Sequence, residues 1–189
     1  MRKFRYYLAV SRRVQQGFNI IEVMVVVALI GIALAIAVPS MAALIRSNRT
    51  TSEISTLVSS IRMAKSEAIK RGSAVQICST TDASTCSGTN VWNTGWLIYV
   101  DSNGNGSLDS GEEIITTEQA FKYAHTLLAS SNSEKIDINR DGFAVNLPST
   151  GKIIYTLTTS PADNNAKRCL SIDLSGNAVV GRHGDANCE

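Results

Sequence analysis

One segment of the sequence has the residue types and the spacing of a calcium-binding loop. From Asp101 to Glu112 the chain reads Asp-Ser-Asn-Gly-Asn-Gly-Ser-Leu-Asp-Ser-Gly-Glu, with oxygen-bearing side chains at positions one, three, five, nine and twelve and glycine at position six. Calcium binds six to eight oxygen ligands, and this pattern supplies most of them. The candidate ligands are Asp101, Asn103, Asn105, Ser107, Asp109 and Glu112. The alternative is a polar hairpin loop without metal, because the flanking residues have the pattern of strands and not of helices.

The carboxylate of Glu22, near the N-terminus, lies within an apolar segment, where a charge is costly without a compensating partner. Glu22 is the only charged residue between Phe18 and Ile45, and a charge inside an apolar membrane helix costs several kcal/mol unless it is paired. Glu22 either lies at the level of the lipid headgroups or pairs with an amine. Cleavage after Gly17 would create such an amine on Phe18, and Glu22 would then bind the amine of a neighbouring subunit.

The residues around Glu22 have the pattern of a membrane segment. Residues 1–17 contain five basic residues and no acidic one, and residues 18–45, at about 42 Å as a helix, are long enough to cross a hydrocarbon core of about 30 Å. The positive-inside rule keeps the basic flank in the cytoplasm. This predicts one span of the inner membrane and a C-terminal head in the periplasm. The alternative is a secretory signal peptide, cleaved after Ala35-Ile36-Ala37 to leave a chain that begins at Val38.

The helical pattern continues beyond the apolar segment. Apolar residues recur between Ser47 and Arg71 with the spacing of a helix that buries one face. Gly72 follows two basic residues and is the expected C-terminal cap. We therefore predict one helix over 18–71, with Gly31 and Pro39 as its weak points. Its parts are an assembly half (18–45) and an amphipathic half (46–72).

Residues 73–189 have the sequence pattern of a small β-rich domain, which we call the head. Short β-like runs alternate with Asn-Gly, Asp-Gly and Ser-Gly turn signals, and one weaker helical segment is expected from Gln119 to Leu128. The fold class is therefore α+β, a long helix packed on antiparallel strands. The expected strands are 74–78, 95–100, 113–117, 136–138, 143–147, 152–158, 169–174 and 178–180.

All four cysteines fall in the head, where an oxidising periplasm favours disulfides. Three connectivities exist, and proximity favours Cys78–Cys86 with Cys169–Cys188. No C-x-x-C spacing is present and the chain has two histidines, so these cysteines do not have the pattern of a zinc site.

Composition excludes several classes of function. The chain has 189 residues, 44% of them hydrophobic, and a net charge of +2. If residues 1–17 are removed, five of the 18 basic residues are lost, and the remaining 13 basic and 16 acidic residues give a net charge of −3. Coating nucleic acid by bulk electrostatics is therefore excluded. The sequence contains no G-x-S-x-G, H-E-x-x-H or phosphate-binding glycine loop, so no enzyme activity is predicted.

These features together resemble a known family. The basic leader, Gly17-Phe18, Glu22, the apolar run and Pro39 resemble the class III signal of type IV pilins and type II secretion pseudopilins. The stretch from Leu57 to Cys78 and the run Gly-Trp-Leu-Ile-Tyr-Val-Asp that ends at Asp101 resemble the GspH/FimT group of FimU-like minor pilins and pseudopilins. The resemblance implies a pilin fold, cleavage of the 1–17 leader and methylation of Phe18 by prepilin peptidase, and packing against other major and minor pilins, with Glu22 and Pro39 in the assembly segment.

The resemblance implies a structural function. The predicted protein is a minor pilin that primes or caps the type IV pilus; the alternatives are a minor pseudopilin of type II secretion and a DNA-uptake pilin. Some members of the group bind DNA through Gly-Arg-x-Arg, of which Gly181-Arg182-His183-Gly184 keeps only the first arginine. The candidate DNA-binding residues are Lys152, Lys167, Arg168 and Arg182, provided that they share one surface.

Overall fold

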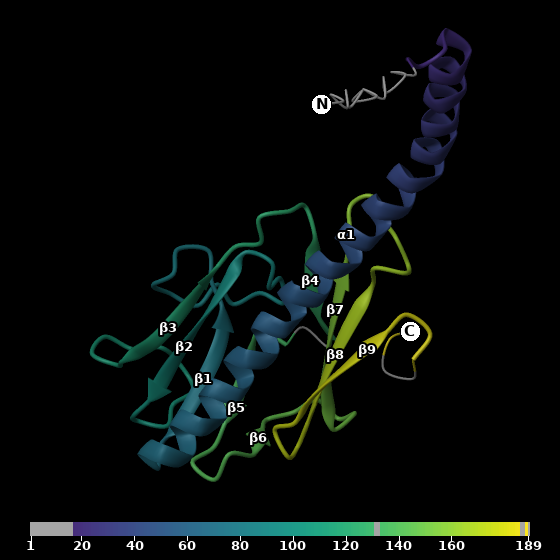
Figure 1. Ribbon diagram of the computed structural model, residues 1–189. Coiled ribbons are helices and arrows are strands. Elements are labelled where there is room, and N and C mark those ends of the chain that lie inside the picture. The colour runs from purple at the N-terminus through teal and green to yellow at the C-terminus, as the bar shows by residue number, and fades with distance from the viewer. Residues whose placement is uncertain (1–16, 131–132, 186–187, 189) are drawn as a thin grey trace, which may run out of the picture. The chain divides into compact units, whose positions relative to one another are not determined.

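The structure is a computed structural model that describes residues 17–130, 133–185 and 188 (Figure 1). Apart from Gly17, the expected leader lies outside these residues. One helix, α1 (Ile20–Arg71), opens the described chain, with Pro39 inside it. Asn19 caps its start, because the side-chain Oδ1 accepts a hydrogen bond from the N–H of Ile21 at 3.2 Å. Its end is the predicted one: Gly72 has φ +65° and donates its N–H to the carbonyl of Ala68.

The chain divides into two compact parts, and the boundary between Met41 and Ala42 falls inside α1. In the first part, every described residue of the helix is exposed, and an 18-residue window of α1 has a mean hydropathy of 2.9. By length and composition this helix can cross a membrane. In the second part, α1 buries one face at the expected helical spacing: Thr50, Ile54, Leu57, Val58, Ser60, Ile61, Ala64 and Ala68.

The strands form two antiparallel sheets. The first sheet has the order β3-β2-β1-β5-β6 and the second the order β4-β7-β8-β9. The first sheet consists of β1 (Ala74–Ser79), β2 (Gly95–Asp101), β3 (Ile114–Gln119), β5 (Lys135–Ile138) and β6 (Ala144–Val145). The second consists of β4 (Thr126–Ala129), β7 (Lys152–Thr158), β8 (Arg168–Asp173) and β9 (Ala178–Arg182).

The larger of two hydrophobic clusters in the described residues joins the buried face of α1 to both sheets. Its largest members include Trp92 and Trp96, which are almost fully buried. Each indole N–H finds an acceptor: Trp92 Nε1 donates to the carbonyl of Ser133 and Trp96 Nε1 to Ser60 Oγ. The second hydrogen bond ties β2 to α1.

The α+β fold class is confirmed, and all eight expected strands overlap strands of the structure. The helix expected from Gln119 to Leu128 is wrong. Gln119 ends β3, and β4 pairs with β7 in the second sheet. In β4 the side chain of Leu127 is buried and that of Leu128 is exposed, which is the alternation of a strand. Pairing with β7 overrides the helix propensity of this segment.

Candidate assembly and ligand sites

The described N-terminal segment presents a carboxylate among apolar side chains. Phe18 precedes the helix and is 82% exposed. It lines a shallow groove of about 200 Å³ with Glu22, Val23, Val26 and Val27. Glu22 is the third residue of α1 and so lies in the first turn, where the partial positive charge of the helix favours an acid. An exposed apolar surface of this length calls for a covering partner or lipid.

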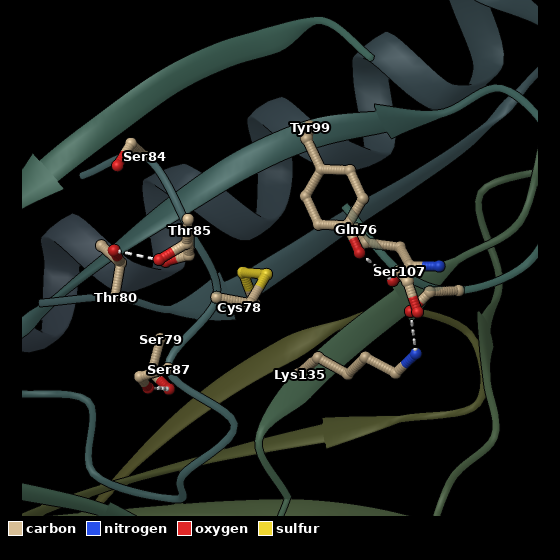
Figure 2. Close-up of a disulfide and its surroundings, with 12 residues drawn as sticks. Gln76, Cys78, Ser79, Thr80, Ser84, Thr85, Ser87, Tyr99, Ser107 and Lys135 are labelled. Carbon is tan, nitrogen blue, oxygen red and sulfur yellow. Dashed lines mark hydrogen bonds between the residues drawn. A yellow bond between two sulfur atoms is a disulfide. The ribbon is translucent and has the colours of Figure 1, made fainter. Parts of the chain in front are cut away.

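Two disulfides lock the head. Cys78, in β1, bonds to Cys86, and Cys169, in β8, bonds to Cys188 near the C-terminus; these are the pairs that proximity favours. Figure 2 shows the first disulfide beside the loop that it closes. Thr80 Oγ1 donates to the carbonyl of Thr85 at 2.6 Å across that loop. Backbone N–H groups of Ser84 and Thr85 hold the pKa of Asp82 well below its usual range. The loop is therefore cross-linked both covalently and by hydrogen bonds.

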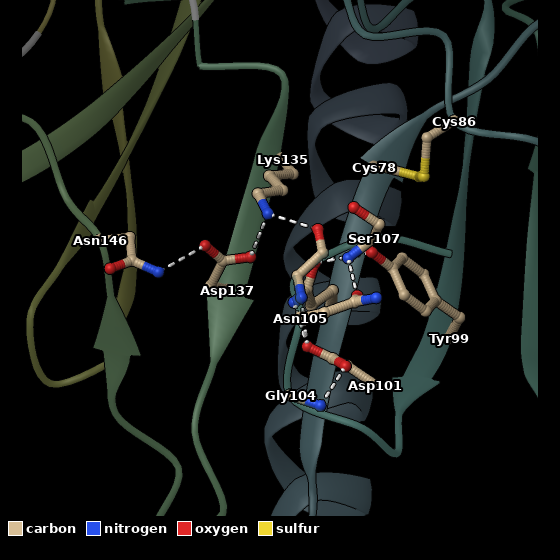
Figure 3. A network of polar contacts seen from close by, with 12 residues as sticks. Cys78, Cys86, Tyr99, Asp101, Gly104, Asn105, Ser107, Lys135, Asp137 and Asn146 are labelled. Atoms are coloured by element: carbon tan, nitrogen blue, oxygen red, sulfur yellow. Dashed lines mark hydrogen bonds and ion pairs between the residues drawn. A yellow bond between two sulfur atoms is a disulfide. The ribbon is translucent and has the colours of Figure 1, made fainter. Parts of the chain in front are cut away.

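The carboxylates of the 101–112 loop are all bonded within the protein. Asp101 Oδ1 accepts the N–H of Gly104 at 2.7 Å, and its Oδ2 accepts the N–H of Gly106 at 2.9 Å (Figure 3). Asp109 Oδ2 accepts the side-chain amides of Asn103 and Asn105 at 2.8 and 2.6 Å, which lowers the pKa of Asp109. Glu112 accepts the backbone N–H groups of Ser102 and Asp109, at 2.8 and 3.1 Å.

A lysine from a distant strand supplies a positive charge to the same loop. Lys135 Nζ, on β5, donates to the carbonyl oxygen of Gly106 at 2.6 Å and lies 3.5 Å from Asp137 Oδ1 (Figure 3). Among the residues that the structure describes, no three histidine, cysteine or acidic side chains are grouped to hold a metal ion. In this structure the loop is closed by its own hydrogen bonds and by Lys135, and the calcium site stays a prediction.

A buried polar row lies next to this loop. Gln76 is opposite Tyr99 on one neighbouring strand and opposite Asp137 on the other. Tyr99 OH donates to Gln76 Oε1 at 2.6 Å, and Gln76 Nε2 donates to Asp101 Oδ2 at 2.7 Å. Sequence reasoning missed this row and Lys135. The only local signal is the alternation of Lys135 and Asp137 with two isoleucines, which places both polar side chains on the face away from the core.

The four candidate DNA-binding residues do not form one surface. Lys152 is opposite Asp173, whereas Arg168 is opposite Leu157, so the two cations lie five residues apart along β7, about 17 Å. Arg168 is only 4% exposed. Its guanidinium donates to Ser47 Oγ at 2.7 Å, to Thr51 Oγ1 at 3.3 Å and to two backbone carbonyls. Arg168 anchors β8 to α1, and Lys152 lies at the other end of the ladder, so Lys152 does not share a surface with Arg168; DNA binding stays a prediction.

Comparisons with known proteins agree with this architecture. Residues 53–177, about two thirds of the chain, match the model of the GspH family, described as type II transport protein GspH. Residues 12–38 match the prokaryotic N-terminal methylation motif. No sequence among curated proteins matches the chain significantly.

Two crystal structures of the type IV minor pilin FimU from Pseudomonas aeruginosa strain PAO1 have a similar fold. The form in space group P21 has a TM-score of 0.56 and is 17% identical, over 75% of this chain and 96% of the crystallised FimU chain. The form in space group P65 has a TM-score of 0.53 at the same identity, over 74% and 99%. At this identity the likeness shows the fold alone. The chain belongs to the GspH family of pilins and pseudopilins, structural and non-enzymatic proteins of type IV pili and type II secretion systems, and carries the N-terminal methylation motif of that class.

Proposed function

We propose that this protein is a minor pilin that primes or caps a type IV filament after its leader has been removed. The observation that carries the proposal is the combination at the N-terminus of an exposed apolar helix with one carboxylate, Glu22, in its first turn. The match to the methylation motif over residues 12–38 supports cleavage after Gly17 and methylation of Phe18 by prepilin peptidase. Lipid covers this helix first, and the helices of neighbouring pilins cover it in the filament.

In this proposal Glu22 sets the register of the subunit. The carboxylate is stable in an apolar bundle only when a cation compensates it, and the new amine of Phe18 on an adjacent subunit is such a cation. Pro39 lies inside α1, where its missing N–H leaves one helical hydrogen bond unmade. That position is a local weak point of the assembly helix.

The maturation step is tested by mass spectrometry of the protein purified from its own membrane. We expect an N-terminus that begins at Phe18 and carries one methyl group. A mature chain that begins at Val38 would show that the apolar segment is a secretory signal peptide, and it would overturn the proposal.

The role of Glu22 is tested by assembly. Glu22→Ala is expected to insert into the membrane normally but to enter filaments poorly, because no carboxylate remains to pair with the neighbouring amine. Asp141→Ala is the control, since it removes an exposed head carboxylate outside the assembly segment 18–45. Equal recovery of both variants in sheared filaments would exclude the pairing.

A second candidate is a minor pseudopilin of a type II secretion system, which the description of the matching family model favours. A deletion strain separates the two functions. Loss of twitching and of surface pili supports the pilus, whereas loss of protein secretion with intact pili supports the pseudopilus. The DNA-uptake alternative predicts loss of transformation alone.

A further inference from the structure

Five cations lie on the helix and strand segments where the head begins. Arg46 is the first charged residue after Glu22, and Arg49 follows it within one helical turn. Lys167 directly precedes β8, Arg168 begins it, and Arg182 ends β9 directly opposite Arg168. The guanidinium of Arg168 bonds Ser47, the residue after Arg46, so the strand cations lie at the level of the helix cations. The five residues Arg46, Arg49, Lys167, Arg168 and Arg182 are called the basic collar.

Among the described residues, no acidic side chain forms an ion pair with the basic collar. Two nearby acids have other partners: Asp185 Oδ2 accepts the backbone N–H of Arg182 at 2.6 Å, and Glu53 pairs with His125 at 2.6 Å. Arg49 lies 4.0 Å from the ring centre of Tyr123, which leaves its charge unpaired.

The environment of Arg168 gives the strongest support for an anion-binding site at the collar. Its guanidinium is buried, and every acceptor that it reaches is a neutral hydroxyl or carbonyl. Burial, and then the charge of Arg182, lower the pKa of Arg168. A buried cation without an anionic partner is costly, and a second cation on the next strand adds to the cost. An anion bound at Arg182 would offset both.

We propose that the basic collar binds phosphate groups of anionic phospholipids in the membrane that holds the apolar segment, and so keeps the head at the membrane surface until the subunit enters a filament. The proposal rests on the proposed function, because a subunit without a membrane-held stage has no lipid beside Arg46. Guanidinium groups match phosphate oxygens in two-pronged hydrogen bonds. A lipid surface is favoured over nucleic acid, because Arg46 directly follows the apolar segment in the sequence and Lys152 lies away from the collar.

The test uses the full chain in lipid nanodiscs that contain equal amounts of phosphatidylglycerol and phosphatidylcholine. Native mass spectrometry then measures which lipid remains bound to the released protein. We expect a preference for phosphatidylglycerol that weakens in high salt. In Arg46→Gln/Arg182→Gln the preference is expected to fall about fivefold for each cation removed. Arg168 is left unchanged, because its hydrogen bonds hold β8 to α1.

The control variant is Arg62→Gln/Arg140→Gln, which removes two exposed cations of the head outside the collar. Its lipid preference is expected to equal that of the wild type. An unchanged preference in the collar variant, an equal loss in both variants, or displacement of the anionic lipid by duplex DNA at the collar would each overturn the proposal. Failure of the chain to insert into nanodiscs of either lipid would contradict the proposed function, whereas insertion without lipid preference would contradict only the collar.

Discussion

The Nζ atom of Lys135 donates a hydrogen bond to the carbonyl oxygen of Gly106 at 2.6 Å and so joins β5 to the loop that follows β2. Gly106 has φ +76°, which favours glycine, and a Cβ there would lie 2.8 Å from Nζ and would displace the ammonium group. The ammonium group of Lys135 therefore lies against the 101–112 loop, the loop whose sequence resembles a calcium site.

This contact predicts a loop that is stable without metal. Addition of calcium or of a chelator is expected to leave the melting temperature of the purified chain unchanged. Lys135→Met keeps the aliphatic stem but removes the charge and should lower the free energy of unfolding by about 1–2 kcal/mol. Lys122→Met, at an exposed position, is the control and should change stability by less than about 0.5 kcal/mol. Stabilisation of the wild type by calcium would contradict this account of the loop.

The ion pairs of Arg71 are expected to make the stability of the folded head depend on pH in the acid range. Its guanidinium binds Glu113 through two hydrogen bonds, at 2.6 and 3.0 Å, and Glu67 through one at 2.6 Å. Arg71 lowers the pKa of both carboxyls below the ordinary value of 4.5. A lowered pKa stabilises the folded state above that ordinary value, and the stabilisation is lost as the pH falls below it towards the folded pKa.

The melting temperature of the wild type is therefore expected to fall as the pH is lowered from 6 to about 3, and that of Arg71→Gln to fall less steeply. Arg140→Gln, a cation without these partners, should keep the wild-type slope. Thermal unfolding followed by circular dichroism in a series of buffers measures both slopes. Parallel curves for the wild type and Arg71→Gln would show that the three side chains are not coupled in solution.

Alanine substitutions at two glycines with positive φ distinguish the cost of backbone strain from the cost of steric overlap. Gly95 has φ +111°, and a Cβ there would lie 2.5 Å from the carbonyl oxygen of Glu118 on β3. Gly104 has φ +73° with nothing within 4 Å of that position. We expect Gly104→Ala to cost about 1–2 kcal/mol, from strain alone, and Gly95→Ala to cost more than about 3 kcal/mol. Chemical denaturation gives both values, and equal costs would mean that β2 and β3 separate readily at this point.

The disulfides are expected to differ in their contribution to stability. Cys169–Cys188 closes a loop of 19 residues in sequence separation, against 8 for Cys78–Cys86. The loop-entropy model gives about 3.3 kcal/mol for the longer loop and about 2.6 kcal/mol for the shorter one. Replacing each pair by serines and measuring the free energy of unfolding tests this order. A larger loss from the Cys78/Cys86 variant would show that native contacts around that loop outweigh chain entropy.

Local patterns in the sequence predicted the elements that local physics controls. The apolar run and the spacing of Ile54, Leu57 and Ile61 predicted α1, because helical periodicity is a property of neighbouring residues. Gly72 predicted its end, since few other residues adopt positive φ without strain. Most strands and the cysteine pairs close in sequence were predictable for the same reason.

Only the tertiary structure decided which segments meet. Residues 126–129 form β4 and not a helix, because β7 offers them a ladder of hydrogen bonds that no local propensity reveals. The placement of Lys135 against Gly106, and of Arg168 against Ser47, depends on contacts between residues 29 and 121 positions apart. Charge and residue type are visible in the sequence, but the burial of Arg168 and the separation of Lys152 from it follow from strand register, which the whole core sets. That is why sequence alone identified the assembly helix, whereas the fold decided that the carboxylates of the 101–112 loop are hydrogen-bonded within the protein and that Lys152 lies apart from Arg168 and Arg182.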